Sequence, residues 1–475
     1  MKLKCVLFIV LPFLLMAQSP NPSDDNPNVR VIWGENPSRN AIVSISGAKA
    51  ELYFDTQDHT ELKAFGHTLT PFSTGKYVDK PWFSTGGESS DSYSHFKLDD
   101  LKPSTTYFFV VKSEAGRSKT FHFVTAPEDD RPFKLIYGGD SRSDPKARRM
   151  VNTLIKNLMA KDSEIIAFVH GGDYNSASDN RKQWQQWLDD YEILVADDGR
   201  VYPIIPTRGN HEGAGVSYNQ VFGFPAGEKI DYWATKIGKL LWITLDSNVS
   251  HGAKQKIFLE KQLKAGQAYR WIVPSYHRPA YPAVKRPGNA FVHWVPLFEK
   301  YNVDLVAESD GHVLKRTLPI RNGQYSEDGI VYVGEGGLGV PQRRPDMSRW
   351  YLKPPGMAAR GHHVQRLSFS KRELLYEAIG LDGKIADSHH FLPRQRGTKS
   401  PIEESIAPQK GPEKQSKPSL GLVKTIAISP QDLDLPSKAP QGGCSTLHPA
   451  QNVYIFAFFA FLFLGASRRR SPLSK

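Results

Sequence analysis

The pattern of hydrophobic and polar residues changes near residue 131. Between residues 28 and 127, short runs rich in β-branched and aromatic residues alternate with turn residues, as in "AIVSISG" and "TTYFFVVKS". This pattern predicts an all-β region that folds as a small sandwich. From residue 131 to residue 393, apolar runs alternate instead with amphipathic stretches such as "PKARRMVNTLIKNLMAK". Alternating strands and helices predict an α/β domain.

Polar residues that can bind a metal follow the apolar runs of the α/β region. In open α/β sheets, ligands bind beyond the carboxyl ends of the strands, so we expect these side chains to converge on one crevice. Carboxylate, amide and imidazole groups together suit Zn, Mn or Fe better than Mg alone. The residues at the run ends are Asp140, Asp173, the pair Asn210 and His211, His277 and His312.

Charge and cysteine content narrow the choice of partners. The formal net charge is +12, but residues 394–475 carry 12 Lys and Arg against 5 Asp and Glu, or +7, which leaves +5 for the rest. The basic excess therefore lies mostly in the tail, and no nucleic-acid partner is expected. Of the two cysteines, Cys5 would leave with a signal peptide, so Cys444 would be unpaired and no internal disulfide is expected.

The two ends of the chain predict export and attachment to a membrane. Residues 1–17 combine early lysines, a short apolar run and a small final residue, which is typical of a secretory signal peptide. Residues 394–449 are rich in Pro, Lys, Gln and Ser and predict a disordered stalk. Residues 450–475 pair an apolar run with three arginines and resemble bacterial C-terminal sorting signals, a plain membrane anchor being the alternative. We therefore expect the protein outside the cytoplasm, at the cell surface or outer membrane of a bacterium.

Five short motifs occur in the order found in the calcineurin-like metallophosphoesterases, and the chain resembles that family. The preceding all-β region and the stretch "PLFEKYNVDLVAESDGHVLKR" look most like the purple acid phosphatase branch. The resemblance implies a β-sandwich core flanked by helices over residues 131–393, preceded by a fibronectin type III-like sandwich over residues 28–127. A carbohydrate or a cell-surface partner is a possible ligand of that sandwich. The motifs are "GGD" at 138–140, "GGD" at 171–173, "GNHE" at 209–212, "SYH" at 275–277 and "DGH" at 310–312.

The resemblance also implies a reaction and roles for single residues. The reaction is hydrolysis of a phosphorylated small molecule or macromolecule by a metal-activated hydroxide, with one or two ions of Fe, Mn or Zn. His211 would face the substrate as a general acid or a positive group, and Arg278 and His293 would line its pocket. The implied metal ligands are Asp140 on the first ion, Asp173 between the ions, and Asn210, His277 and His312 on the second.

Three positions depart from the family pattern, all around the first metal. Leu314 stands where the family has a second histidine, and Ser176 stands where purple acid phosphatases have a metal-bound tyrosine, although Tyr174 is close. Arg142 stands where other members have a histidine. The first ion could therefore be weak or absent, and Arg142 could hold phosphate in its place through its planar donor fork. The alternative is a solvated Arg142 at the start of a helix, and in either case no purple colour is expected.

Two classes of function remain open. The first is the metal-dependent phosphoesterase, and the second is a non-catalytic phosphate-binding or scaffold protein on a degenerate metallophosphoesterase fold. Leu314 and Ser176 favour the second class. Two other polar residues have simpler interpretations: His170 as a hydrogen-bonded core histidine, and Glu212 either as the residue that positions His211 or as a surface acid.

Overall fold

The computed structural model describes residues 27–80, 85–114, 116–223 and 231–396. The chain divides into two units, Met1–Ser405 and Ile406–Lys475, and the described residues belong to the first. The predicted signal peptide, the C-terminal segment and nearly all of the predicted stalk lie outside the described residues. Among the described helices, none has both the length and the apolar character needed to cross a membrane.

The N-terminal residues form the all-β region that the sequence predicts. Two groups of strands pack against each other through a buried core that includes Val43, Leu52, Phe96 and Phe109. One group is β1 (Arg30–Ile32), β2 (Ala41–Ser46), β5 (Ser73–Asp79) and β6 (Gly87–Leu98). The other is β3 (Glu51–Asp55), β4 (His67–Leu69), β7 (Thr106–Ser113), β8 (Gly116–Arg117) and β9 (Phe121–Val124). The likeness to fibronectin type III domains stays a prediction.

The sheet that contains β1 continues beyond the N-terminal region. β1 pairs in parallel with β12 (Ile204–Pro206), with Ile32 opposite Ile204, so that one sheet of ten strands spans both regions. The chain boundary near residue 127 therefore separates two stretches of chain but not two sheets. The remaining strands of this sheet are β10 (Phe133–Gly138), β11 (Ile165–His170), β22 (His363–Phe369), β23 (Leu374–Gly380) and β24 (Ile385–Phe391).

A second sheet of seven strands packs on the first. The core between them is apolar and includes Leu135 and Val169 from the first sheet and Trp242 and Val273 from the second. Its strands, in order across the sheet, are β13 (Trp233–Ile237), β14 (Leu240–Thr244), β15 (Trp271–Tyr276), β16 (Leu305–Glu308), β20 (Val331–Gly334), β17 (Leu314–Arg316) and β21 (Met357–Ala359).

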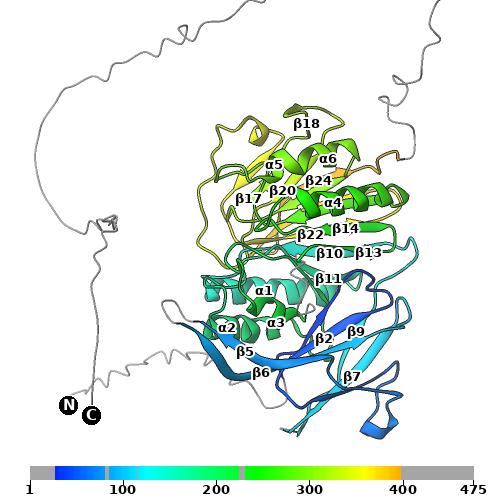
Figure 1. The fold of residues 1–475 in the computed structure, drawn as a ribbon. Helices are drawn as coiled ribbons and strands as arrows, with labels where there is room; N and C mark the ends of the chain where they lie inside the picture. Colours follow the sequence, from blue (N-terminus) through cyan, green and yellow to red (C-terminus); the bar gives the residue numbers. More distant parts are fainter. Residues whose placement is uncertain (1–26, 81–84, 115, 224–230, 397–475) are drawn as a thin grey trace, which may run out of the picture. The chain divides into compact units, whose positions relative to one another are not determined.

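Helices cover the outer faces of both sheets, which confirms the predicted α/β class (Figure 1). α1 (Pro145–Lys161) begins after Asp144, whose carboxylate accepts a hydrogen bond from the Ala147 N–H and so caps the helix. α2 (Arg181–Tyr191) and α3 (Ser217–Phe222) lie with α1 against the first sheet. The helices on the second sheet are α4 (Ala253–Ala265), α5 (Ala290–His293) and α6 (Val295–Lys300).

Candidate metal centre

The polar side chains at the strand ends meet at one place, as predicted. Asp140 follows β10, Asp173 follows β11 and His277 follows β15, so the ends of both sheets contribute. The backbone is strained there, because Asp140, Asp173, Asp310 and His312 all have φ between 59° and 72°. Left-handed conformations of residues other than glycine cost energy and gather at functional sites. Four of them in one place indicate that the side-chain positions are under functional constraint.

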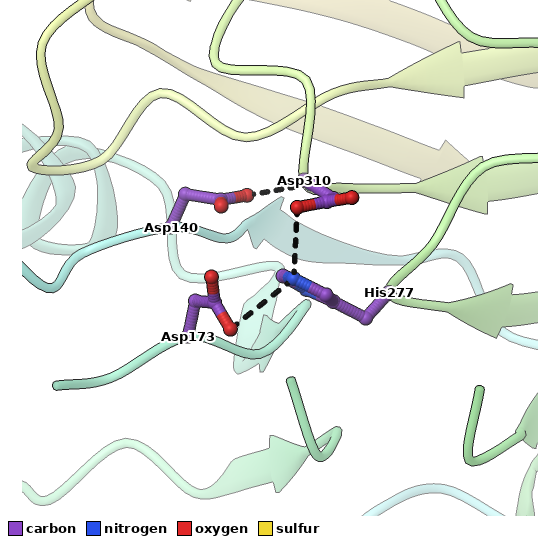
Figure 2. A group of neighbouring side chains, drawn as sticks. All are labelled: Asp140, Asp173, His277 and Asp310. Carbon is purple, nitrogen blue, oxygen red and sulfur yellow. Dashed lines mark hydrogen bonds and ion pairs between the residues drawn. The ribbon is translucent and has the colours of Figure 1, made fainter. Parts of the chain in front are cut away.

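Asp140, Asp173, His277 and Asp310 form a buried cluster (Figure 2). One donor atom of each residue lies within 4.8 Å of the others. His277 Nε2 is 3.2 Å from Asp173 Oδ1 and 3.6 Å from Asp310 Oδ1, and the Asp310 N–H donates to Asp140 Oδ2 at 2.8 Å. Three buried carboxylates this close together repel one another unless positive charge lies among them.

The surroundings of His277 show that a metal ion fits this cluster. Nδ1 of His277 donates to the carbonyl oxygen of Gly171 at 2.7 Å, which turns Nε2 toward the carboxylates. Although burial alone would lower the pKa of His277, the nearby Asp173 raises it above its usual range, so a proton at Nε2 occupies the place that a cation would take. Burial alone would raise the pKa of Asp310, but His277 and Lys285 lower it to about 2, so the carboxyl group is charged at neutral pH. Carboxylates with an imidazole nitrogen are a donor set for Zn, Mn or Fe.

Asn210 adds a neutral donor beside His277 and Asp310. One terminal atom of its amide lies 3.2 Å from both His277 Nε2 and Asp310 Oδ1. With nitrogen at this position the amide donates to both, whereas with oxygen there it faces only acceptors, as a ligand of a cation does. The predicted ligands Asp173, Asn210 and His277 are therefore brought together.

Asp310 is absent from the predicted ligand set, and its position corrects the one predicted for His312. The sequence predicts His312 beside His277, but His312 Nε2 lies 3.2 Å from Asp140 Oδ1, while Asp310 takes the place beside His277. Asp310 and His312 thus keep the two-residue spacing of the family's last motif, with Asp in the first position. Leu314 is a buried core residue of β17 and does not mark a lost ligand.

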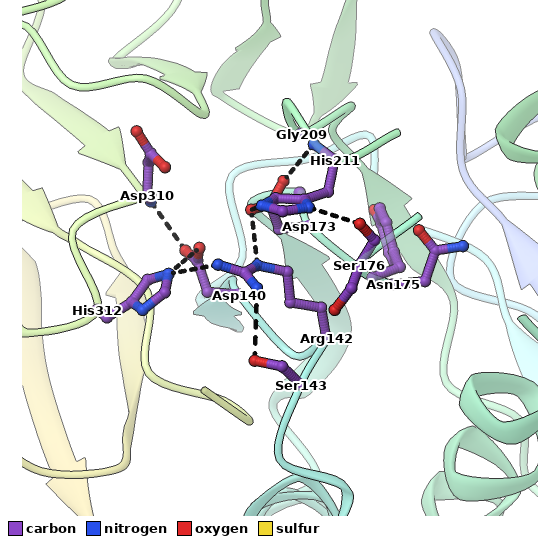
Figure 3. A network of polar contacts seen from close by, with 12 residues as sticks. Asp140, Arg142, Ser143, Asp173, Asn175, Ser176, Gly209, His211, Asp310 and His312 are labelled. Carbon is purple, nitrogen blue, oxygen red and sulfur yellow. Dashed lines mark hydrogen bonds and ion pairs between the residues drawn. The ribbon is translucent and has the colours of Figure 1, made fainter. Parts of the chain in front are cut away.

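Arg142 lies inside the site and not in solvent at a helix start (Figure 3). Its side chain is 14% exposed, its Nε donates to Asp173 Oδ2 at 3.2 Å, and its Nη2 donates to His312 Nε2 at 3.4 Å. The helix begins three residues later, at Pro145. The solvated alternative is therefore wrong, and the guanidinium group lies between Asp173, the predicted bridging ligand, and His312, which the sequence predicts on the second ion.

His211 faces the same carboxylate from the other side (Figure 3). Its backbone N–H donates to Asp173 Oδ1 at 2.9 Å, and its Nδ1 lies 2.9 Å from the carbonyl oxygen of Ser176. The carbonyl group makes Nδ1 the protonated nitrogen and directs Nε2 into the site, 3.8 Å from Asp173 Oδ2. The side chain of His211 is 29% exposed, so a substrate can reach it.

His170 and Tyr174 lie behind the site, in the aromatic core. Nδ1 of His170 accepts from the Gly172 N–H at 3.1 Å, and Nε2 lies 2.9 Å from Ser141 Oγ, which confirms the predicted core histidine. Tyr174 stacks on the His170 ring at 3.9 Å between centroids and is fully buried. Tyr174 is therefore part of the packing and does not replace the tyrosine missing at Ser176.

Glu212 holds the two loops that carry Asp173 and Asn210. It is fully buried, and its carboxylate accepts from the backbone N–H groups of Asp173 at 2.9 Å, Gly209 at 2.8 Å and Tyr174 at 2.8 Å. Burial and the nearby Asp173 charge raise its pKa to about 7. Neither predicted role describes it, because it positions backbone rather than the His211 side chain and is not at the surface.

Lys315 holds the turn that carries Asp310 and His312. Its ammonium group is fully buried and donates to Glu308 Oε2 at 2.5 Å, Glu335 Oε1 at 3.0 Å and the Tyr281 carbonyl oxygen at 2.8 Å. Glu308 ends β16 just before the turn, and Lys315 lies in β17 just after it. The Lys315–Glu308 ion pair therefore holds together the two ends of the turn that carries Asp310 and His312.

A second basic side chain, Lys285, contacts the cluster at Asp310. Its ammonium group pairs with Asp310 Oδ1, and its side chain is 38% exposed. Arg343 donates to the Asp310 carbonyl oxygen at 3.1 Å. Positive side chains thus contact two of the carboxylates, Asp173 and Asp310, which favours an anionic ligand.

A cavity of about 350 Å³ lies beside Asn210. Arg278, a predicted substrate-binding residue, lines this cavity. The other, His293, ends α5 with its ring centre 6.5 Å from that of His251 and is not among the described residues that line the cavity. The structure therefore brings Arg278 to the site and leaves His293 outside the cavity.

Comparison with known proteins agrees with this geometry. The model of the calcineurin-like phosphoesterase family matches residues 142–314. An uncharacterized protein of Mycobacterium tuberculosis is 24% identical over 274 residues, which are 48% of this chain and 51% of that protein, so the chain spans about half the length of this relative. Probable inactive purple acid phosphatase 27 of Arabidopsis thaliana is 24% identical over 405 residues, which cover 72% of this chain and 64% of that protein.

The fold has a solved counterpart. Purple acid phosphatase PPD1 from yellow lupin seeds superposes with a TM-score of 0.63 at 18% identity, over 76% of this chain and 73% of that chain. The chain therefore contains a calcineurin-like metallophosphoesterase domain with a fold shared with purple acid phosphatases.

Proposed function

We propose that the protein is a metal-dependent phosphoesterase that hydrolyses phosphate esters. The observation that carries the proposal is the buried cluster of Asp140, Asp173, His277 and Asp310, with the imidazole of His211 facing it. The cluster combines an acidic donor set for a cation with a partly exposed group that can transfer a proton. The calcineurin-like phosphoesterase domain supports the same reaction class.

In this proposal one metal ion and two side chains, Arg142 and His211, have separate roles in the reaction. Asp173, Asn210, His277 and Asp310 would hold a single ion of Fe, Mn or Zn, which supplies Lewis-acid catalysis and a lowered pKa for water when bound. Arg142 takes the place of a second ion, and its donor fork holds the phosphoryl oxygens. In its doubly protonated form, His211 donates from Nδ1 to the Ser176 carbonyl oxygen and offers the second proton, at Nε2, to the leaving oxygen.

The test is the metal content of the purified full-length chain together with hydrolysis of p-nitrophenyl phosphate in Mn, Fe, Zn and Mg. We expect one transition-metal ion per chain and turnover that is lost in Asp173→Asn. We expect Arg142→Met to keep the ion and to lower kcat/KM on the order of 100-fold, as for the loss of a charged transition-state contact. A chain that binds no transition metal and hydrolyses nothing with any of the four metals contradicts the proposal.

The second candidate is a non-catalytic phosphate-binding protein on the same fold. Arg142 and Lys285 favour it, since both side chains already pair with carboxylates of the cluster. The name of the Arabidopsis relative, a probable inactive phosphatase, points the same way. This candidate predicts that inorganic phosphate still binds to Asp173→Asn with unchanged affinity, whereas the enzyme requires that affinity to fall with the metal.

We also propose that the protein acts outside the cytoplasm on a phosphorylated substrate and is held at a membrane by its C-terminal segment. The sequences of residues 1–17 and 450–475 support this location. Fractionation of cells that express the full-length chain, or a chain shortened after residue 449, tests it. We expect the full-length chain in the membrane fraction and the shortened chain outside the cytoplasm in soluble form. Finding the full-length chain in the cytoplasm contradicts the proposal.

A further inference from the structure

The cavity beside Asn210 borders the candidate metal centre at that residue. Its lining comes from the loop after β12, from α3, from Asp231 just before β13, and from the loops after β14 and β15. Asn210 belongs to both features, because it lines the cavity and its amide lies 3.2 Å from His277 Nε2 and Asp310 Oδ1. A group joined to a phosphate at the metal centre through one ester oxygen would therefore extend past Asn210 toward the cavity.

On one wall of the cavity, the charge of Arg208 is balanced by its ion pair with Asp231. The Arg208 side chain is 4% exposed and donates to the carbonyl oxygens of Gly213 at 3.0 Å and Gly215 at 2.8 Å. It also donates to Asn219 Oδ1 at 2.6 Å and pairs with Asp231 at 2.9 Å. Its hydrogen bonds brace the loop, and its charge is balanced by a buried carboxylate. Arg208 is therefore not available to bind an anion in the cavity.

A second wall presents acceptor groups. Asp246 accepts from the backbone and side-chain N–H groups of Asn248, both at 2.8 Å, and Asn248 Nδ2 also donates to the Gly209 carbonyl oxygen at 3.0 Å. Both amide hydrogens of Asn248 are thus used within the protein, and its carbonyl oxygen is the group left for a guest. This wall accepts hydrogen bonds and repels anions.

The rim of the cavity is apolar. Val216 is 47% exposed and Val249 is 45% exposed, and both line the cavity. We call this feature the Val216–Val249 cavity. A single exposed valine is common on protein surfaces, but two valines on one cavity provide an apolar contact surface for a ligand. The cavity volume of about 350 Å³ lies at the lower end of the range for ligand pockets.

We propose that the Val216–Val249 cavity binds the alcohol part of the ester and selects a neutral ring that carries hydroxyl groups, in preference to a second phosphate. The proposal rests on the proposed phosphoesterase function and adds the class of substrate to it. Hydroxyl groups donate to the acceptor wall, the ring contacts the valines, and the carboxylate of Asp246 disfavours further negative charge. Arg278 also lines the cavity, and in this proposal its guanidinium group binds the phosphate that is cleaved.

The test uses three phosphate esters and a variant that fills the cavity. We measure kcat/KM of the full-length chain for methyl phosphate, a hexose monophosphate and a hexose bisphosphate, in the wild type and in Val216→Trp. Val292→Trp is the matched control, since Val292 is 67% exposed on α5 and does not line the cavity. Val249→Trp is a second filling variant, in case the first fails to fold.

We expect the wild type to prefer the hexose monophosphate to both other esters on the order of tenfold. Either filling variant should remove that preference and leave methyl phosphate within about twofold of the wild type, and the control should change nothing. An equal loss for all esters, no loss, or a preference for the bisphosphate overturns the proposal. If no ester is hydrolysed, the proposed function fails, and binding of the same esters measured by calorimetry still decides whether the cavity takes the ring.

Discussion

Lys315→Met tests how the turn that carries Asp310 and His312 is held in place. Lys315 and its two partners, Glu308 and Glu335, all have 0% side-chain exposure. Methionine keeps the apolar stem and removes the charge, so two buried carboxylates would face each other without a cation. Removing one partner from a buried ion pair costs about 3–5 kcal/mol. That is a large part of the about 5–15 kcal/mol by which folded proteins are usually stable.

Urea unfolding followed by tryptophan fluorescence measures the loss in the free energy of unfolding. The matched control is Lys384→Met, because Lys384 is 83% exposed and its removal should change stability by less than about 0.5 kcal/mol. Combining Lys315→Met with Glu308→Gln removes one of the two facing charges and should restore part of the loss. Non-additivity in this double-mutant cycle measures the coupling directly.

The pH dependence gives an independent check on the cause. Burial already raises the pKa of Glu335 to about 7, although Lys315 opposes the shift. Without Lys315, Glu335 in the folded state keeps a proton at pH values where the unfolded chain, with a pKa of 4.5, has released it. The free energy of unfolding of the variant therefore falls as the pH rises above 4.5. We therefore expect a smaller loss at pH 5 than at pH 8. A loss below about 1 kcal/mol at pH 8, or an equal loss at both pH values, refutes the reasoning.

Two other substitutions have clear expected outcomes. Lys285→Met should tighten Mn²⁺ binding on the order of tenfold, as measured by calorimetry, because the Lys285 ammonium group competes with the metal for Asp310 Oδ1. The control is Arg286→Met, which makes the same change in charge. Equal Mn²⁺ affinities in the two variants would contradict the competition. Glu192→Gln should flatten the dependence of thermal stability on pH. Burial raises the pKa of Glu192 to about 7 despite its hydrogen bond with Asn28, so the wild type loses stability as the pH rises from 4.5 to about 7 and the glutamine variant does not. Parallel melting curves across that range would show that Glu192 is not responsible.

The ends of the strands could be predicted from the sequence for a simple physical reason. A buried strand is a short apolar run, and the first polar residue after it marks the edge of the sheet where ligands bind. Asp140, Asp173 and His277 all follow that rule. The α/β class and the all-β start of the chain follow from periodicity in the same way.

The parts that could not be predicted depend on which neighbour a side chain faces. Asp310 and His312 are two residues apart in one turn, and only the path of the turn decides which of them lies beside His277. The spacing Asp-x-His was the available signal. The role of Glu212 could not be predicted either, because its partners are backbone N–H groups, which every residue except proline has.

The pairing of β1 with β12 affects how the chain folds during synthesis, because the two strands are far apart in the sequence. Ile32 meets Ile204, which lies 172 positions later, so β1 leaves the ribosome long before its partner exists. At about 5–20 residues per second the delay is on the order of ten seconds or more. During that time β1 has β2 on one side and an open edge on the other, the kind of edge that recruits foreign strands. An exported chain that stays unfolded until it has crossed the membrane would avoid this interval altogether.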